Sequence, residues 1–128
     1  MRLLLDTHVF LWWLEDSPHL GARARDILND EHNELLWSLA SSWELAIKVA
    51  LGRMRIPEPL PEYLPRVLEE QSVRLLPIDH GHVLRVSELP RHHKDPFDRL
   101  LVAQAQIERV PVLTRDDDFR RYDVEVVW

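Results

Sequence analysis

The stretch of sequence that decides the fold is His92-His93-Lys94-Asp95-Pro96-Phe97-Asp98-Arg99-Leu100-Leu101-Val102-Ala103-Gln104-Ala105-Gln106. It predicts a helix over 96–109, because Asp95 can cap the helix, Pro96 suits the first helical position and Asp98 falls near the third. The residues after Asp98 are apolar around most of the helix, so the helix should be largely buried. Two carboxylates therefore stand at the exposed N-terminal end of a central helix. Taken alone, they are explained as caps that the helix dipole stabilises.

The composition limits the class of protein. The chain has 128 residues, which predicts one domain over 1–128, and it contains no cysteine, so neither disulfides nor thiolate zinc sites can form. Only three leucines precede Asp6, too few for a secretory signal, and no apolar run approaches the ~18 residues of a membrane span. We therefore expect a cytoplasmic protein. The net charge of −6 argues against a protein that coats duplex DNA, but a nuclease with clustered acids remains compatible with it.

Short apolar runs alternate along the chain with helical segments. Strands are predicted at 3–5, 35–39, 73–78, 111–114 and 124–128. Helices are predicted at 7–14 with Thr7 as cap, 22–28, 41–51, 64–68, 80–89 and 96–109. The prolines at 57, 59 and 61 predict an extended connector before the helix at 64–68. Strands that alternate with helices are typical of an α/β fold with a parallel sheet and right-handed crossovers.

This topology brings acidic residues from separate parts of the chain to one edge of the sheet. Asp6 ends the first strand, Asp116 lies two residues beyond the fourth, and Glu44 opens the helix after the second. The helix that carries Asp95 and Asp98 precedes the fourth strand and runs antiparallel to it. Its N-terminus therefore faces the carboxyl ends of the strands, which is where ligands bind in such sheets.

Carboxylates gathered within a few ångströms must either take up protons or bind cations. Oxygen ligands without cysteine favour Mg²⁺ or Mn²⁺ over zinc, and such ions can activate water at a phosphodiester. Each acid also has a structural explanation of its own. Glu44, for example, has the spacing of a capping box with Ser41 and of an i,i+4 pair with Lys48. All of these acids at one edge are less easily explained as caps, so the pattern favours a metal site.

Basic residues lie beside these acids in the sequence. Arg91, Lys94, Arg99 and Arg115 could hold phosphates or form surface ion pairs with the same acids. His92 and His93 could orient a carboxylate, contact phosphate or be solvated loop residues, and His8 could pack or act. Asp117 and Asp118 are typical of a solvated turn, with Phe119 returning to the core.

Four pieces of the chain together resemble the PIN-domain ribonucleases, and closely the VapC toxins of bacterial type II toxin–antitoxin pairs. They are Leu5-Asp6-Thr7-His8, Ser42-Trp43-Glu44-Leu45-Ala46-Ile47-Lys48 with Leu51-Gly52-Arg53, His93-Lys94-Asp95-Pro96-Phe97-Asp98-Arg99-Leu100-Leu101, and Thr114-Arg115-Asp116 with Phe119. They extend over essentially the whole chain. The Asp-Pro-Phe-Asp-Arg piece is highly specific in this order and context.

The resemblance implies a three-layer PIN-like fold, a parallel five-stranded sheet in the order 3-2-1-4-5 flanked by helices. It assigns metal binding most firmly to Asp6 and Asp98, with Glu44 and Asp116 completing an acidic quartet and Asp95 as a further ligand or a cap. It implies a toxin that cleaves RNA with Mg²⁺ or Mn²⁺, forms a homodimer and is blocked by a VapB-like antitoxin, through which alone it would contact operator DNA. A partly uncovered apolar set, Trp12, Trp13, Leu64 and Leu68, is expected to receive the antitoxin.

Two other functions compete with this one. A phosphoacceptor signalling domain also clusters acids on a doubly wound sheet, but it requires an acidic pair after the first strand and a lysine after the last. Here Asp6 is followed by Thr7 and His8, and the fourth strand leads to Arg115-Asp116. The second alternative is a catalytically silent PIN domain that only binds RNA or protein, and the intact acids argue against it.

Overall fold

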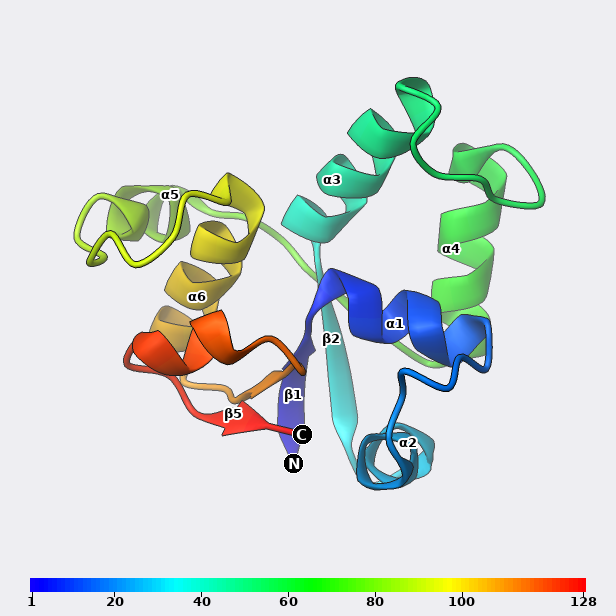
Figure 1. Cartoon of the computed structure of the whole chain (residues 1–128), viewed down its shortest axis with the longest axis horizontal. Coiled ribbons are helices and arrows are strands. Elements are labelled where there is room, and N and C mark those ends of the chain that lie inside the picture. The colour runs from blue at the N-terminus through cyan, green and yellow to red at the C-terminus, as the bar shows by residue number, and fades with distance from the viewer.

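The computed structural model describes all residues from Met1 to Trp128. Five parallel strands form one sheet in the order β3-β2-β1-β4-β5, which confirms the predicted class and strand order (Figure 1). The strands are β1 Arg2–Leu5, β2 Glu34–Ser38, β3 Arg74–Leu76, β4 Val112–Leu113 and β5 Val126–Val127. The last three are shorter than predicted, because the ladder hydrogen bonds cover fewer residues than the apolar runs do.

Helices cover both faces of this sheet, so the fold has three layers. They are α1 Thr7–Leu14, α2 Ala22–Asn29, α3 Leu39–Ala50, α4 Leu60–Glu70, α5 His80–Val86 and α6 Pro96–Glu108, with a 3₁₀ helix η1 over Asp117–Arg121. In Figure 1, α1, α2 and α4 lie on one side of β1 and β2, and α5 and α6 lie on the other. The helix α3 projects beyond the edge of the sheet.

The alternation of side chains along β1 explains the two layers of core. Leu3 and Leu5 face the side that carries α1, α2 and α4, and Leu4 faces the side of α6. All three leucines are fully buried, as expected for a central parallel strand. Phe10 and Trp37 fill the first core layer with ring centroids 5.0 Å apart, and Phe119 fills the second, as predicted.

Two predicted helix starts are wrong. Helix α3 begins at Leu39, where the side chain of Ser38 accepts a hydrogen bond from the Ala40 amide, so Ser41 and Glu44 form no capping box. Ser41 is instead buried inside the helix. Helix α1 is capped by Asp6, not by Thr7, whose hydroxyl donates to Ser41 Oγ at 2.6 Å. The predicted end of α3 is confirmed, since Gly52 follows it with φ of 70° in a left-handed cap.

Helix α4 begins four residues earlier than predicted, because it includes two prolines that were expected to lie outside the helix or to interrupt it. Pro61 lies in the first turn, where amide groups lack helical partners anyway, and Pro65 removes one hydrogen bond from the next turn. Burial of Leu64, Val67 and Leu68 compensates for that loss. Helix α5 ends at Val86, three residues before the predicted Leu89, and α6 ends one residue before the predicted Arg109, which takes a left-handed cap conformation.

The apolar set expected to receive an antitoxin does not remain uncovered. Leu64 and Leu68 are buried in the chain's own core, and Trp12 and Trp13 are half-buried against it. That expectation is therefore wrong for the two leucines, because α4 itself packs on the sheet. The large exposed apolar side chains lie elsewhere, and four of the nine lie along α3 and at the residue after it. None of the helices has the length and apolar character that crossing a bilayer requires.

Candidate functional site

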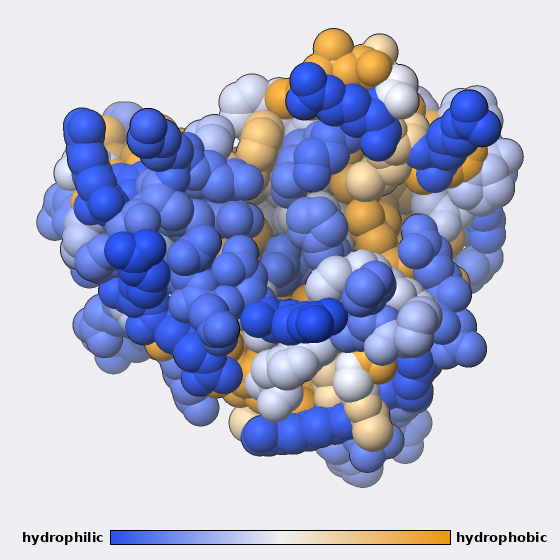
Figure 2. Space-filling view, viewed as in Figure 1, coloured by the Kyte–Doolittle hydropathy of each residue, from blue (hydrophilic) through white to orange (hydrophobic).

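The five predicted acids come from four segments that meet at the carboxyl edge of the sheet. Asp6 follows β1, Asp116 follows β4, Glu44 lies in the second turn of α3, and Asp95 and Asp98 begin α6. In Figure 1 the starts of α1, α3 and α6 are turned toward this edge. Figure 2 shows mostly hydrophilic side chains over α5 and α6, on the side of the molecule that carries Asp98. The structure thus brings the predicted residues into one region.

Asp98 is the centre of this group. Its side chain is only 17% exposed, and burial together with the charges of the other four acids raises the pKa of Asp98 to about 8. In order of decreasing effect, those charges belong to Asp95, Asp6, Glu44 and Asp116. A carboxyl group in this position binds either a proton or a cation at neutral pH. The other four acids therefore all act electrostatically on Asp98, in agreement with the single edge that the topology predicted.

Thr114 ties two of the acids together. Its hydroxyl donates to Asp6 Oδ2 at 2.7 Å and accepts from the Asp116 amide at 3.0 Å. Thr114 is buried at the end of β4, so these bonds hold the ends of β1 and β4 in register beside the site. The Asp6 carboxylate also raises the pKa of His8, whose ring Nδ1 lies 3.9 Å from Asp6 Oδ1. His8 is about half exposed, so it borders the site without packing into the core.

Glu44 is buried and paired. Its Oε2 accepts a hydrogen bond from Lys48 Nζ at 2.9 Å, which confirms the predicted i,i+4 pair. The Lys48 side chain is 31% exposed and the Glu44 side chain 6%, so the lysine keeps contact with solvent while it compensates a buried charge. Glu44 therefore has a structural partner and still lies within electrostatic reach of Asp98.

Asp95 is the cap of α6. Its Oδ1 accepts from the amides of Phe97 and Asp98 at 2.9 and 3.1 Å, while its Oδ2 accepts no hydrogen bond. The cap fixes the backbone that carries Asp98. Of the two roles considered for Asp95, capping is thus the one that the hydrogen bonds show.

His93 reaches the acids from the loop before α6. Its Nε2 is buried without a hydrogen-bond partner and lies 3.6 Å from Asp98 Oδ2. Its Nδ1 lies 2.7 Å from the hydroxyl of Tyr122, which holds the ring in place. Of the alternatives left open for His93, a solvated loop position is therefore wrong. Tyr122 lies 24 residues after Asp98, in a segment without any sequence motif, and sequence reasoning missed it.

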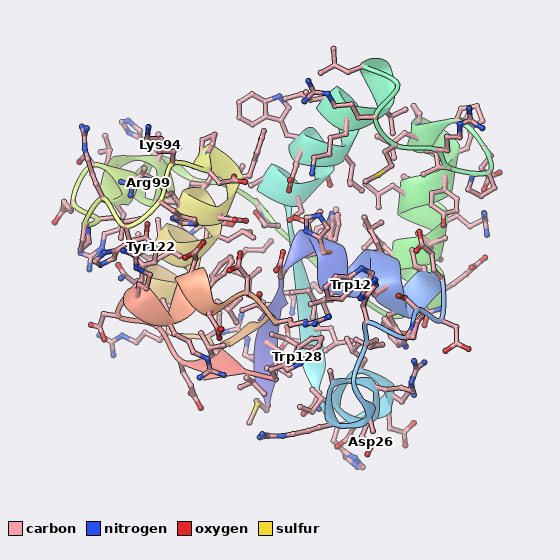
Figure 3. The ribbon with its side chains drawn as sticks, viewed as in Figure 1. Trp12, Asp26, Lys94, Arg99, Tyr122 and Trp128 are labelled. Carbon is pink, nitrogen blue, oxygen red and sulfur yellow. The ribbon has the colours of Figure 1, made fainter.

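Arg99 anchors this loop and is not free to hold phosphate. Its guanidinium donates to the carbonyls of Pro90 and Val86, at 2.8 and 3.2 Å, and to the Tyr122 hydroxyl at 3.3 Å. Figure 3 shows Arg99, Tyr122 and Lys94 gathered on the α5–α6 side of the molecule. Arg91 and Lys94, by contrast, are exposed and form neither an ion pair nor a side-chain hydrogen bond.

The donor set of the site suits a hard divalent cation, because every candidate ligand is a carboxylate oxygen. No three acidic or histidine side chains lie close enough together to hold one ion as they stand. The hydrogen bonds above explain this spacing, since Asp6, Glu44 and Asp95 each direct an oxygen toward Thr114, Lys48 or the helix amides. A cation bound at this edge would stabilise the ionised form of Asp98, which burial and the charges of the other four acids disfavour.

Comparisons with known proteins agree with the fold and the motifs. The model of the PIN domain family matches residues 3–125. Ribonuclease VapC22 of Mycobacterium tuberculosis (strain ATCC 25618 / H37Rv) is 30% identical over 122 residues, which cover 94% of this chain and 91% of that protein. Ribonuclease VapC16 of the same strain is 39% identical over 69 residues, 51% of this chain and 49% of that protein, so this match spans about half of its length.

A solved structure shares the architecture at lower identity. The crystal structure of VapBC2 from Rickettsia felis, bound to a DNA fragment from the promoter, contains a chain that superposes with a TM-score of 0.73 at 16% identity, over 99% of this chain and 98% of that one. At this identity the likeness supports the fold alone. The resemblance seen in the sequence is confirmed by the family match: this chain belongs to the PIN-domain family, and it is similar to ribonuclease VapC22 over nearly its whole length.

Proposed function

We propose that this protein is a metal-dependent endoribonuclease and the toxin of a type II toxin–antitoxin pair. The observation that carries the proposal is the largely buried Asp98 carboxyl, whose pKa is raised to about 8 by burial and by the charges of four other acids. The similarity to two proteins named ribonucleases supports RNA as the substrate. A silent PIN domain that only binds a partner would have no need for so costly a cluster of charges.

In this proposal Asp6 and Asp98 are the principal ligands of Mg²⁺ or Mn²⁺, Glu44 and Asp116 complete the site, and Asp95 is a further ligand through its Oδ2. The bound ion would supply an activated water and neutralise charge at the phosphorus. Thr114 fixes Asp6, Lys48 fixes Glu44, and His93 lies beside the Asp98 oxygen. The chain's own contribution is thus to hold carboxylate oxygens in position and to shield them from bulk water on the Asp98 side.

We expect RNA cleavage to stop in excess EDTA and to return when Mg²⁺ or Mn²⁺ is added back. The reason is that the proposed nucleophile depends on the ion that the carboxylates hold. The measurement is a time course with labelled single-stranded RNA, and Asp98→Asn purified in the same way reveals any contaminating nuclease. Cleavage that persists in EDTA contradicts the metal mechanism, and absence of cleavage under all metal conditions supports the silent alternative.

We also propose a VapB-like antitoxin as the partner, which would bind operator DNA in the complex. The resemblance to the VapC toxins is the reason for this proposal, and a chain of the VapBC2 complex, determined with a promoter DNA fragment, has the same fold. A small adjacent open reading frame that encodes a DNA-binding head and an amphipathic tail is the simplest observation to seek. Co-purification of its product with this chain would support the pairing, and recovery of an active, unpartnered chain from the native operon would contradict it.

A homodimer is the third part of the proposal, and the exposed face of α3 supports it. Leu39, Trp43, Ile47 and Leu51 recur every four residues and are 38, 59, 37 and 61% exposed. Figure 2 shows hydrophobic colour at the outer end of this helix. An exposed apolar stripe of this kind is typical of an interaction surface.

We expect Trp43→Glu to convert the dimer into a monomer, because a charge in the centre of the α3 stripe cannot be buried against a second copy. Sedimentation velocity measures the change. The matched control is Leu75→Glu, which places the same charge at a half-exposed residue of β3, outside the stripe. A wild-type chain that sediments as a monomer at all concentrations contradicts the dimer.

A further inference from the structure

The five acids of the candidate site, Asp6, Glu44, Asp95, Asp98 and Asp116, are called the acidic centre. Two cavities flank it, and the residues that line them differ in chemistry. The first, called the aromatic pocket, has a volume of about 450 Å³ and is lined by Asp6, His8, Trp12, His19, Arg115 and Asp116. The second, called the basic pocket, has a volume of about 460 Å³ and is lined by Arg91, His92, His93, Lys94 and Arg99. In Figure 3, Trp12 lies on α1 on one side of β1, and Lys94 lies on the other.

The aromatic pocket presents flat rings beside two of the acids. The ring centroids of Trp12 and His19 are 5.3 Å apart, and those of Trp12 and His8 are 6.2 Å apart. Arg115 Nη1 lies 3.4 Å from His19 Nδ1 and adds a planar cationic group to the wall. No aliphatic side chain lines this cavity. Aromatic and guanidinium planes are the surfaces on which unpaired bases stack.

The basic pocket presents positive charge without any acid in its lining. Arg91 and Lys94 have no ionic partner, whereas eight of the sixteen lysine and arginine side chains are paired with a carboxylate, for example Arg66 with Glu58. Arg99 is bound to carbonyl groups and keeps the loop in place. Unpaired lysine and arginine side chains on a fixed loop are suited to phosphate oxygens.

Both pockets adjoin the acidic centre. Asp6 and Asp116 form part of the aromatic pocket, and His93 of the basic pocket lies 3.6 Å from Asp98. We propose that one single-stranded RNA segment occupies both pockets, with an unpaired base stacked in the aromatic pocket and backbone phosphate held by Arg91 and Lys94. The strand then crosses the carboxylates between the two contacts. This inference rests on the proposed ribonuclease function and adds how the substrate is held.

The base contact and the phosphate contact can be distinguished with a ligand that has no bases, because only the base contact depends on them. Binding is measured by fluorescence anisotropy for a short labelled oligoribonucleotide and for a ribose-phosphate chain of the same length without bases. All proteins carry Asp98→Asn and are kept in EDTA, so that no strand is cut. Trp12→Leu should weaken binding of the oligoribonucleotide about tenfold and leave the base-free chain unaffected, because stacking needs a base. Trp12→Phe, which keeps a ring, should restore most of the affinity.

Loss of the two cations of the basic pocket should instead weaken the binding of both ligands alike, because phosphate is present in each of them. Arg91→Gln with Lys94→Gln should weaken binding of both ligands by the same factor and reduce the slope of log affinity against log salt by about 1.4, since each phosphate contact contributes about 0.7 for single strands. The matched control is Arg53→Gln with Arg55→Gln, which removes two exposed and unpaired cations from the connector after α3. It should change neither affinity nor slope.

Trp12 is half-buried, so its replacement is accompanied by a second test at an exposed ring. His19→Gln keeps a hydrogen-bonding side chain and should also weaken binding of the oligoribonucleotide alone. If both Trp12→Leu and His19→Gln affect the two ligands equally, or affect neither, while the wild-type chain still cuts RNA, the base contact is wrong and the proposed function stands. If the chain with intact pockets neither binds nor cuts RNA, the proposed function fails and this inference with it.

Discussion

Replacement of Asp98 by asparagine is expected to lower ribonuclease activity by orders of magnitude without destabilising the protein in EDTA. With a pKa of about 8, the carboxyl group of Asp98 is mostly protonated at neutral pH when no cation is bound. Asparagine has the same shape and is also neutral, so the free energy of unfolding should hold or rise. What the variant loses is one negative oxygen ligand and the activity that depends on it.

Melting curves with and without metal test this explanation. Added Mg²⁺ or Mn²⁺ should raise the melting temperature of the wild type more than that of Asp98→Asn, since a ligand stabilises only through its affinity for the folded state. Asp123→Asn is the matched control, because Asp123 is exposed and its side chain forms no hydrogen bond or ion pair. It should leave stability, metal response and activity unchanged. A destabilised but fully active Asp98→Asn would mean that Asp98 only supports the start of α6.

The position of the Asp98 carboxyl group could be predicted because it depends on the direction of the strands and helices and not on their exact boundaries. Leu3-Leu4-Leu5 is buried on both faces, and an apolar run of this kind belongs in the middle of a parallel sheet. Once β1 and β4 are parallel, Asp6 and Asp116 must emerge at the same edge. The helix that carries Asp98 must then begin there. Each step follows from chain direction, so errors of a few residues in element boundaries did not affect it.

The start of α3 could not be predicted in the same way, because three serines compete for it. Ser38, Ser41 and Ser42 are all good capping residues. Distant partners decide between them: Ser38 Oγ donates to Gln104 of α6 at 2.5 Å, and Ser41 accepts from Thr7 of α1. These contacts join segments 34 and 66 residues apart, and no local pattern contains that information.

The hydrogen-bond partners of the site residues could not be predicted either, because they also come from distant segments of the chain. Thr114, Tyr122 and the carbonyls that hold Arg99 become relevant only when α6, η1 and the loop before α6 are packed together. The sequence showed which residues carry charge near the site. It did not show that Arg99 is used to fix the loop while Arg91 and Lys94 stay free, because that depends on the direction in which each side chain leaves the backbone.

The same carboxyl group predicts an unusual dependence of stability on pH. Asp98 has a pKa of about 8 in the folded protein and 3.8 as its ordinary value. Between these values the folded state binds a proton that the unfolded state does not, so the free energy of unfolding falls as pH rises and becomes level above about pH 8. Each unit of pKa difference corresponds to about 1.4 kcal/mol, so the total effect is on the order of several kcal/mol.

Asp98→Asn isolates this contribution, since every other titrating group is retained. In EDTA, the free energy of unfolding of the variant minus that of the wild type should be near zero at pH 4 and should grow steadily to about pH 8. Urea titrations at a series of pH values measure it, with Asp123→Asn again as the control. A difference that stays constant from pH 4 to pH 8 would mean that Asp98 ionises as an ordinary surface carboxylate. The burial of Asp98 and its repulsion by the other four acids, which are the physical basis of the proposed metal site, would then be absent.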